Sequence, residues 1–170
     1  MVGVFQPARF SGANATISGP PKGYATNSTA WDQPYADPTW SGLCTGHLGS
    51  ADLYVAFGDK YGIPFSRISN AETRHLTEVR IVLKRYAIAD PTAGKAAGTF
   101  ATASTQQLYN KLLAQGTASV DGARTAARMV ESTDITDLKA AATGVTAPDV
   151  TQVYKNLLAA SERHLVAFGG

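Results

Sequence analysis

The sequence predicts an all-α protein: a four-helix bundle with a short extra helix and an irregular N-terminal arm. From residue 46 onward, apolar residues recur at three- and four-residue spacings, the period of an amphipathic helix. No segment of any length alternates between apolar and polar residues as a half-buried strand would. Because 44% of the 170 residues are hydrophobic, the chain can bury a sizeable core.

The N-terminal arm, residues 1–45, differs in composition from the rest of the chain. It is rich in Gly, Pro, Ser, Thr and Asn, and prolines at this density forbid a long helix. We expect the arm to pack its aromatic rings onto the bundle, or onto a second copy or a protein partner, because solvated linkers seldom carry many rings. A floppy tail is the alternative. The rings are those of Phe5, Phe10, Tyr24, Trp31, Tyr35 and Trp40.

The bundle, residues 46–170, divides at residues that commonly begin or end helices. The first helix is predicted to run from residue 46 to a stop at Gly62. The second starts after Pro64, has Ser66 as its candidate N-cap, and ends before Asp90, which precedes a proline. These two helices are the first half of the predicted bundle.

The second half follows a loop rich in Gly, Ala and Thr. Ser104 is expected to cap the short extra helix. A third long helix carries residues 120–131, and Thr133 or Asp134 is expected to restart a further turn. The last helix opens at Pro148, because proline is favoured in the first turn.

Composition excludes several classes of protein. Fifteen Lys and Arg against thirteen Asp and Glu give a net charge of +2 with no basic run, so no nucleic-acid binding is expected. No stretch approaches the roughly 18 apolar residues of a membrane span. Cys44 is the single cysteine, so neither an intrachain disulfide nor a Cys-rich zinc site is expected. The first ten residues lack the charged and apolar regions of a signal peptide, and the compartment stays open.

Glu72 and His75 form the strongest local signal for chemistry. Residues three apart on a helix share a face, so this carboxylate and imidazole can meet one ion. Both lie in the apolar stripe of the second helix, where a buried carboxylate needs a cation or a proton. Paired Glu-x-x-His units hold metals in bundle cores. An ordinary helix salt-bridge face is the alternative for the pair taken alone.

The other candidate ligands lie on the three remaining long helices. His164 lies in the apolar stripe of the last helix, Glu131 ends the stripe of the third, and His47 lies on the same face of the first helix as Tyr54. Singly, His164 could be a satisfied core histidine and Glu131 a solvated helix end. The chain has only three histidines, however, and each falls on the inward face of a different helix. We therefore predict a metal site made of His47, Glu72, His75, Glu131 and His164.

Several motifs between residues 51 and 168 resemble a known family. They are Asp52-Leu-Tyr-Val-Ala-Phe-Gly-Asp-Lys-Tyr-Gly62, Ile68-Ser-Asn-Ala-Glu-Thr-Arg-His75, Val130-Glu-Ser-Thr-Asp-Ile-Thr-Asp-Leu138, and Gln152 to Phe168 with its Ser161-Glu-Arg-His164. With the short helix from Gln107 to Gly116, these stretches are similar to the bacterial and archaeal ferritin-like family catalogued as domain of unknown function 2202, a relative of rubrerythrins.

The resemblance implies a ferritin-like bundle with a carboxylate on the first helix, Glu-x-x-His on the second, Glu on the third and His on the fourth. Glu72, His75, Glu131 and His164 match these positions. At the first position this chain has His47, seven residues before Tyr54, where the family has Glu. Ser161 stands where ferritin-like proteins repeat the Glu of Glu-x-x-His. The site is thus rich in imidazole and poor in negative charge.

Two functions are open at this stage. The first is metal-dependent redox work, iron oxidation or peroxide handling, with Tyr54 as a hydrogen-bond donor beside the ligands or merely a core tyrosine. Three imidazoles with two carboxylates suit Fe, Zn or Cu. We expect Fe, and one ion rather than two. The second is a non-catalytic structural or interaction subunit with a degenerate metal site, assembled through the N-terminal arm. Low charge and a surface rich in Ala, Gly and Thr favour such an assembly.

Overall fold

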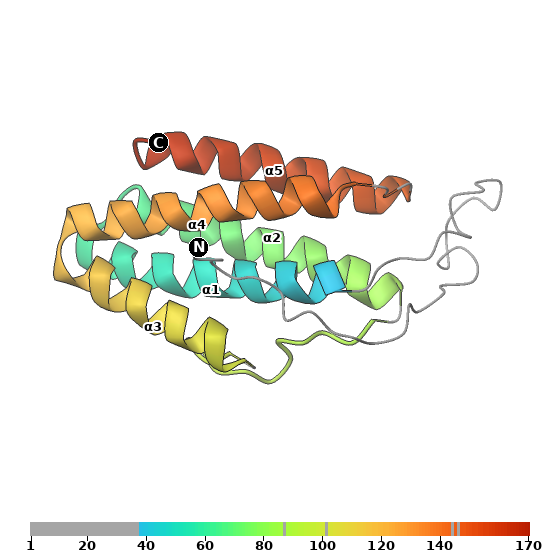
Figure 1. The fold of residues 1–170 in the computed structure, drawn as a ribbon, viewed down its shortest axis with the longest axis horizontal. Coiled ribbons are helices and arrows are strands. Elements are labelled where there is room, and N and C mark those ends of the chain that lie inside the picture. Colours follow the sequence, from blue (N-terminus) through green and yellow to red (C-terminus); the bar gives the residue numbers. More distant parts are fainter. Residues whose placement is uncertain (1–37, 87, 101, 144, 146) are drawn as a thin grey trace.

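The structure is a computed structural model that describes residues 38–170 except 87, 101, 144 and 146, and side chains from residue 49 onward. This part of the chain contains five α-helices and no strand, so the prediction of an all-α protein is confirmed (Figure 1). Residues 1–37, most of the predicted arm, lie outside it. The helices are α1 Pro38–Tyr61, α2 Phe65–Arg85, α3 Ala103–Ala118, α4 Val120–Ala141 and α5 Pro148–Ala167.

Four of the helices surround a common interior. α1 packs along α2, α4 packs along α5, and the two pairs meet through contacts of α1 with α4 and of α2 with α5. α2 and α4 run in one direction, whereas α1 and α5 run in the opposite direction (Figure 1). α3 lies outside this group, against α4 and α1. Side chains from the inward faces of α1, α2, α4 and α5 can therefore meet.

The helix boundaries differ from those predicted at several points. α1 begins at Pro38, earlier than residue 46, because proline is compatible with a first helical turn. α2 begins directly after Pro64, and Ser66 lies inside the helix instead of capping it. α4 continues without a break past Thr133 and Asp134. Burial of Asp134 and Leu138 on the inward stripe keeps this last part of the helix packed.

Two helix starts are fixed by side-chain caps. Thr102, and not Ser104, caps α3 by accepting a hydrogen bond from the backbone N–H of Thr105 at 3.2 Å. Ser119 caps α4 by accepting from the N–H of Gly122 at 3.0 Å. Each cap satisfies a backbone donor that the first turn leaves unpaired. Pro148 stands in the first turn of α5, as predicted.

The core consists of two apolar clusters with polar side chains between them. One cluster includes Phe57, Ile68, Val130 and Phe168. The other includes Leu76, Val79, Leu138, Tyr154 and Leu157. On α2, α4 and α5 buried polar residues lie between the parts of the helix that belong to the two clusters. These are Glu72 on α2, Glu131 and Asp134 on α4, and Ser161 and His164 on α5.

None of the helices in the described residues is both long enough and apolar enough to cross a membrane.

Candidate metal centre

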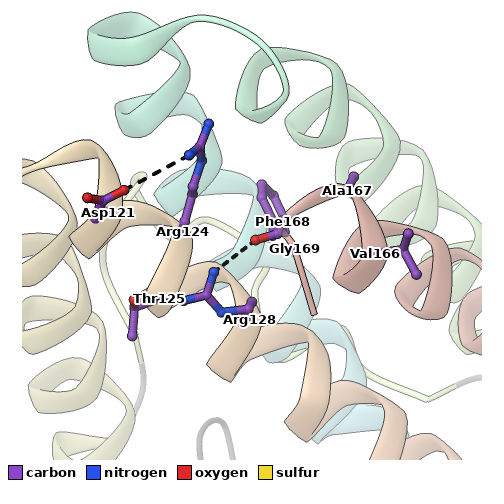
Figure 2. Close-up of a pocket in the computed structure, with 8 residues that line it drawn as sticks. All are labelled: Asp121, Arg124, Thr125, Arg128, Val166, Ala167, Phe168 and Gly169. Atoms are coloured by element: carbon purple, nitrogen blue, oxygen red, sulfur yellow. Dashed lines mark hydrogen bonds and ion pairs between the residues drawn. The ribbon is translucent and has the colours of Figure 1, made fainter.

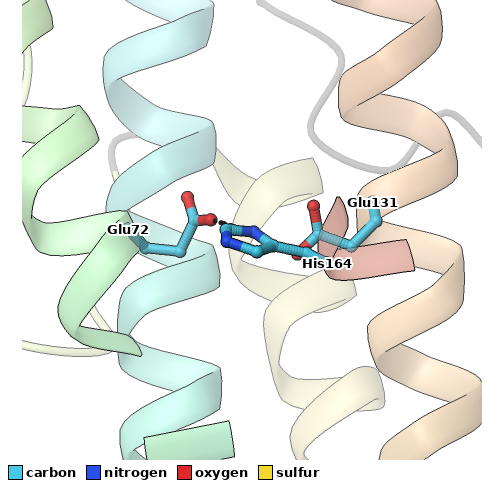
Figure 3. Close-up of side chains that lie close together, drawn as sticks. All are labelled: Glu72, Glu131 and His164. Carbon is cyan, nitrogen blue, oxygen red and sulfur yellow. Dashed lines mark ion pairs between the residues drawn. The ribbon is translucent and has the colours of Figure 1, made fainter. Parts of the chain in front are cut away.

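Glu72, Glu131 and His164 meet in the interior from three different helices. One ligand atom of each lies within 4.8 Å of the others (Figure 3). The His164 Nδ1 atom is 3.0 Å from Glu72 Oε1 and 3.4 Å from Glu131 Oε1. Both glutamates are 0% exposed and His164 is 8% exposed. The chain thus brings together three of its five predicted ligands in a largely buried position.

His75 lies at the edge of this group. Its Nδ1 atom is 3.5 Å from Glu72 Oε1. Its ring stacks on that of His164, with 5.8 Å between centroids and 27° between planes. His75 therefore contacts both Glu72 and His164, but it is not among the side chains that meet within 4.8 Å. The side chain of His47 lies outside the described part of the chain.

Tyr54 of α1 closes the group from the fourth helix. Its hydroxyl donates a hydrogen bond to Glu131 Oε1 at 2.8 Å, and its side chain is fully buried. Burial raises the pKa of Tyr54 well above its usual value, and the negative charges of Glu131, Glu72 and Asp134 raise it further. The phenol therefore keeps its proton at neutral pH and acts as a donor that orients Glu131.

The electrostatics of the group favour a bound cation. Burial raises the pKa of Glu131, and the charge of Glu72 adds to this, whereas hydrogen bonds from His164 and Tyr54 oppose it. Burial alone would lower the pKa of His164, but its hydrogen bonds to Glu131 and Glu72 and their charges raise it to about 9. The two carboxylates thus stabilise an imidazolium among them. A metal ion in place of that proton would be favoured by the same negative charges.

Two further buried polar residues lie beside the group: Asp134, which was not predicted there, and Ser161, whose position was noted as that of a missing glutamate. Asp134, 7% exposed, lies one turn after Glu131, and Ser161, 0% exposed, lies one turn before His164. Because α4 and α5 are antiparallel, both extend the group in the same direction. Within the described residues, the Ser161 hydroxyl and Glu131 Oε2 have no hydrogen-bond partner. The spacing of three residues between Glu131 and Asp134 was the signal that could have identified Asp134. We interpreted Asp134 instead as the start of a new turn of helix.

A surface depression of about 420 Å³ lies at the beginning of α4 and the end of α5 (Figure 2). Arg128 Nη1 donates to the backbone oxygen of Phe168 at 2.9 Å, and Arg124 lies 4.0 Å from Asp121. The Phe168 ring packs on Tyr54, with 5.3 Å between centroids. Arg128 thus anchors the residue that covers Tyr54. Each of the two lining arginines thus has a partner within the protein, an acid for Arg124 and a backbone carbonyl for Arg128.

Three comparisons relate the chain to known proteins. Residues 48–169 match the sequence model described as "Uncharacterized protein domain (DUF2202)". The uncharacterized protein MJ0754 of Methanocaldococcus jannaschii is 30% identical over 118 residues, which are 69% of this chain. The chain spans only 64% of that relative's length. The crystal structure of hypothetical protein MJ0754 from Methanococcus jannaschii DSM 2661 is similar with a TM-score of 0.72 and 27% identity, over 76% of this chain and 75% of that one.

The family match covers most of the sequence and includes every residue of the buried group. These findings bear out the resemblance noted from the motifs as far as the uncharacterized family. The chain belongs to the family of uncharacterized domains designated DUF2202.

Proposed function

We propose that this protein binds a transition-metal ion in its interior, with Glu72, Glu131 and His164 as ligands. The observation that carries the proposal is the convergence of these side chains from three helices, all buried, within 4.8 Å of one another. Burying ionisable groups is costly unless a counter-charge accompanies them. A divalent ion bound by two carboxylates and a neutral imidazole gives a site of zero net charge.

Residues and helices around the three proposed ligands support a more detailed form of this proposal. His75 stands beside Glu72 and completes the predicted Glu-x-x-His unit, and His47 of α1 stays a predicted ligand. Four helices around a buried centre support a ferritin-like bundle. Imidazole with carboxylate suits Fe, Zn or Cu. Iron is our choice, because the resemblance to ferritin-like proteins implies iron oxidation or peroxide handling.

A purely structural role is the competing interpretation. An imidazolium held by two carboxylates is itself a buried cluster of opposite charges, and such clusters exist without any metal. The two roles differ in one measurable respect: only a metal centre takes up a metal ion with the loss of the His164 proton. The idea of a scaffold assembled through residues 1–45 rests mostly on residues outside the described part and stays a prediction.

Titration with Co(II), followed by its visible absorption and by calorimetry, tests the proposal. We expect one Co(II) per chain, and a loss of affinity of at least about 100-fold in Glu131→Gln and in His164→Gln, beyond the range for residues outside the coordination shell. Glu162→Gln is the matched control, because Glu162 is an exposed acid on α5 whose described ion pair is with Lys139. Equal affinities in all four proteins, or no binding by the unmodified protein, would refute the metal centre.

Redox turnover is tested separately. If the centre oxidises iron, the unmodified protein accelerates aerobic Fe(II) oxidation above the rate in buffer, and Glu131→Gln does not. Tyr54→Phe is expected to slow the reaction less, because it removes a hydrogen bond to a ligand and leaves the ligand in place. Equal rates with and without the protein would leave a binding site and no enzyme.

A further inference from the structure

Asp134 adds a third carboxylate to the surroundings of the centre. It lies on α4, one turn beyond Glu131, with 7% of its surface exposed. Its charge acts on Tyr54, whose hydroxyl is hydrogen-bonded to Glu131 Oε1. Asp134 is not among the three side chains that meet within 4.8 Å. It is therefore a charge close to the ligands but outside the contact group.

Helix geometry places Asp134 on the α1 side of the centre. Lys139 of α4 lies 3.7 Å from Glu162 of α5, so the α4 surface around position 139 faces α5. At 3.6 residues per turn, position 139 lies about 80° to one side of position 131, and position 134 lies about 60° to the other. Asp134 consequently points away from α5 and toward α1, the helix that carries Tyr54. A second carboxylate of α4 thus lies next to Glu131, on the side of Tyr54.

The number of negative charges around the metal site therefore depends on Asp134. Glu72 and Glu131 alone balance a divalent ion, whereas three carboxylates balance a trivalent one. In a buried site an unbalanced charge is costly, so the third carboxylate shifts the preference toward the higher charge. From this arrangement we infer that Asp134 makes the centre selective for a trivalent over a divalent ion, and hence for Fe(III) over Fe(II). This inference rests on the metal centre proposed above.

The same carboxylate has one other possible role, as a ligand of a second divalent ion next to the first. The two roles differ in stoichiometry. A selectivity residue leaves the protein with one ion per chain, whereas a second site gives two. Two Co(II) ions bound per chain, reduced to one by Asp134→Asn, would overturn the inference.

The test is the reduction potential of the iron-loaded protein, together with the affinities for Co(II) and for redox-inert Ga(III). In Asp134→Asn we expect the preference for Fe(III) over Fe(II) to fall at least tenfold, a positive shift of about 59 mV for one electron. The ratio of Ga(III) to Co(II) affinity falls in parallel. Asp134→Glu keeps the charge and is expected to retain the original potential, which a merely structural role would not predict.

Asp137→Asn is the matched control. Asp137 is the next acid along α4, is only partly buried, and undergoes the same exchange of carboxylate for amide. Both variants lose one negative charge, at two different distances from the centre. The difference between their reduction potentials therefore reports the effect of distance, whatever else Asp134 contacts. A potential shift in Asp134→Asn no larger than that in Asp137→Asn, with Co(II) still bound, overturns this inference alone. If the unmodified protein binds no metal, the proposed function fails as well.

Discussion

His164 is the residue on which the charge of the centre depends when no metal is bound. Its pKa is raised to about 9 from an ordinary 6.5, so its bonds with Glu72 and Glu131 stabilise the fold fully below about pH 6.5 and progressively less as pH rises through 9. The loss amounts to roughly 3 kcal/mol by pH 10, because a difference of one in pKa corresponds to about 1.4 kcal/mol. Urea unfolding of chelator-treated protein between pH 6 and 10 measures it.

His164→Gln supplies the control for this pH dependence. The variant cannot carry the charge, so the part of the pH dependence assigned to His164 disappears and the contributions of other groups remain. A stability that rises with pH in this range, or an identical curve in the variant, would contradict the assignment. Metal binding to the unmodified protein at pH 7 releases the same proton, since a ligating imidazole must be neutral.

The members of the buried group were predictable from sequence to the extent that helical period alone places them inward. Glu72 and His164 lie in strong apolar stripes, and the structure buries both. Asp134 was not predicted as part of the centre, because an Asp after Ser and Thr resembles a helix cap. Local sequence cannot separate a cap from an inward carboxylate. What decides is the tertiary packing that keeps α4 helical to Ala141.

At the scale of elements, the close approach of α3 to α1 depends on Gly116. A Cβ atom at this position would overlap the ring of Phe57, which is fully buried. We predict that Gly116→Ala destabilises the protein by about 1–3 kcal/mol, because overpacking outweighs the gain in helix propensity. The midpoint of urea unfolding measures this. The residue was predicted only as the end of a helix, whereas the structure gives it a packing role inside α3.

A second substitution separates crowding from backbone effects at this contact. In the Phe57→Leu background the smaller side chain leaves room for the added methyl group. Gly116→Ala should therefore cost less there than in the unmodified protein, giving a coupling of about 0.5–3 kcal/mol. Additive effects would mean that the contact of α3 with α1 does not depend on the absence of a side chain at Gly116.

At the scale of the whole molecule, the polar centre interrupts the core. The apolar cluster around Phe57 and Phe168 and the one around Val79 and Leu157 are separated along α2, α4 and α5 by Glu72, Glu131 and His164. A continuous apolar core would serve stability better, because replacing a buried ion cluster with apolar residues of similar volume is often neutral or stabilising. The arrangement is understandable if the centre is kept for binding and not for folding.

Substitutions can measure this cost to stability. A combined variant, Glu72→Met, Glu131→Met, His164→Leu and Tyr54→Phe, replaces the ion cluster and the hydroxyl that bonds to it. Without metal it should be as stable as the unmodified protein, or more stable by up to about 4 kcal/mol. Glu131→Met alone should cost about 3–5 kcal/mol, because it removes one of the two carboxylates that hold His164 and the acceptor of the Tyr54 hydroxyl.

Metal shifts the comparison in favour of the unmodified protein. Co(II) at 100 times its dissociation constant should stabilise the unmodified protein by about 2.7 kcal/mol and leave the combined variant unchanged, which unfolding with and without Co(II) measures. If the combined variant is much less stable than the unmodified protein without metal, the cluster is a folding element in its own right. If Co(II) stabilises both proteins equally, the ion binds elsewhere. Both expected results are obtained only if the buried group lowers the stability of the metal-free protein and metal binding restores it.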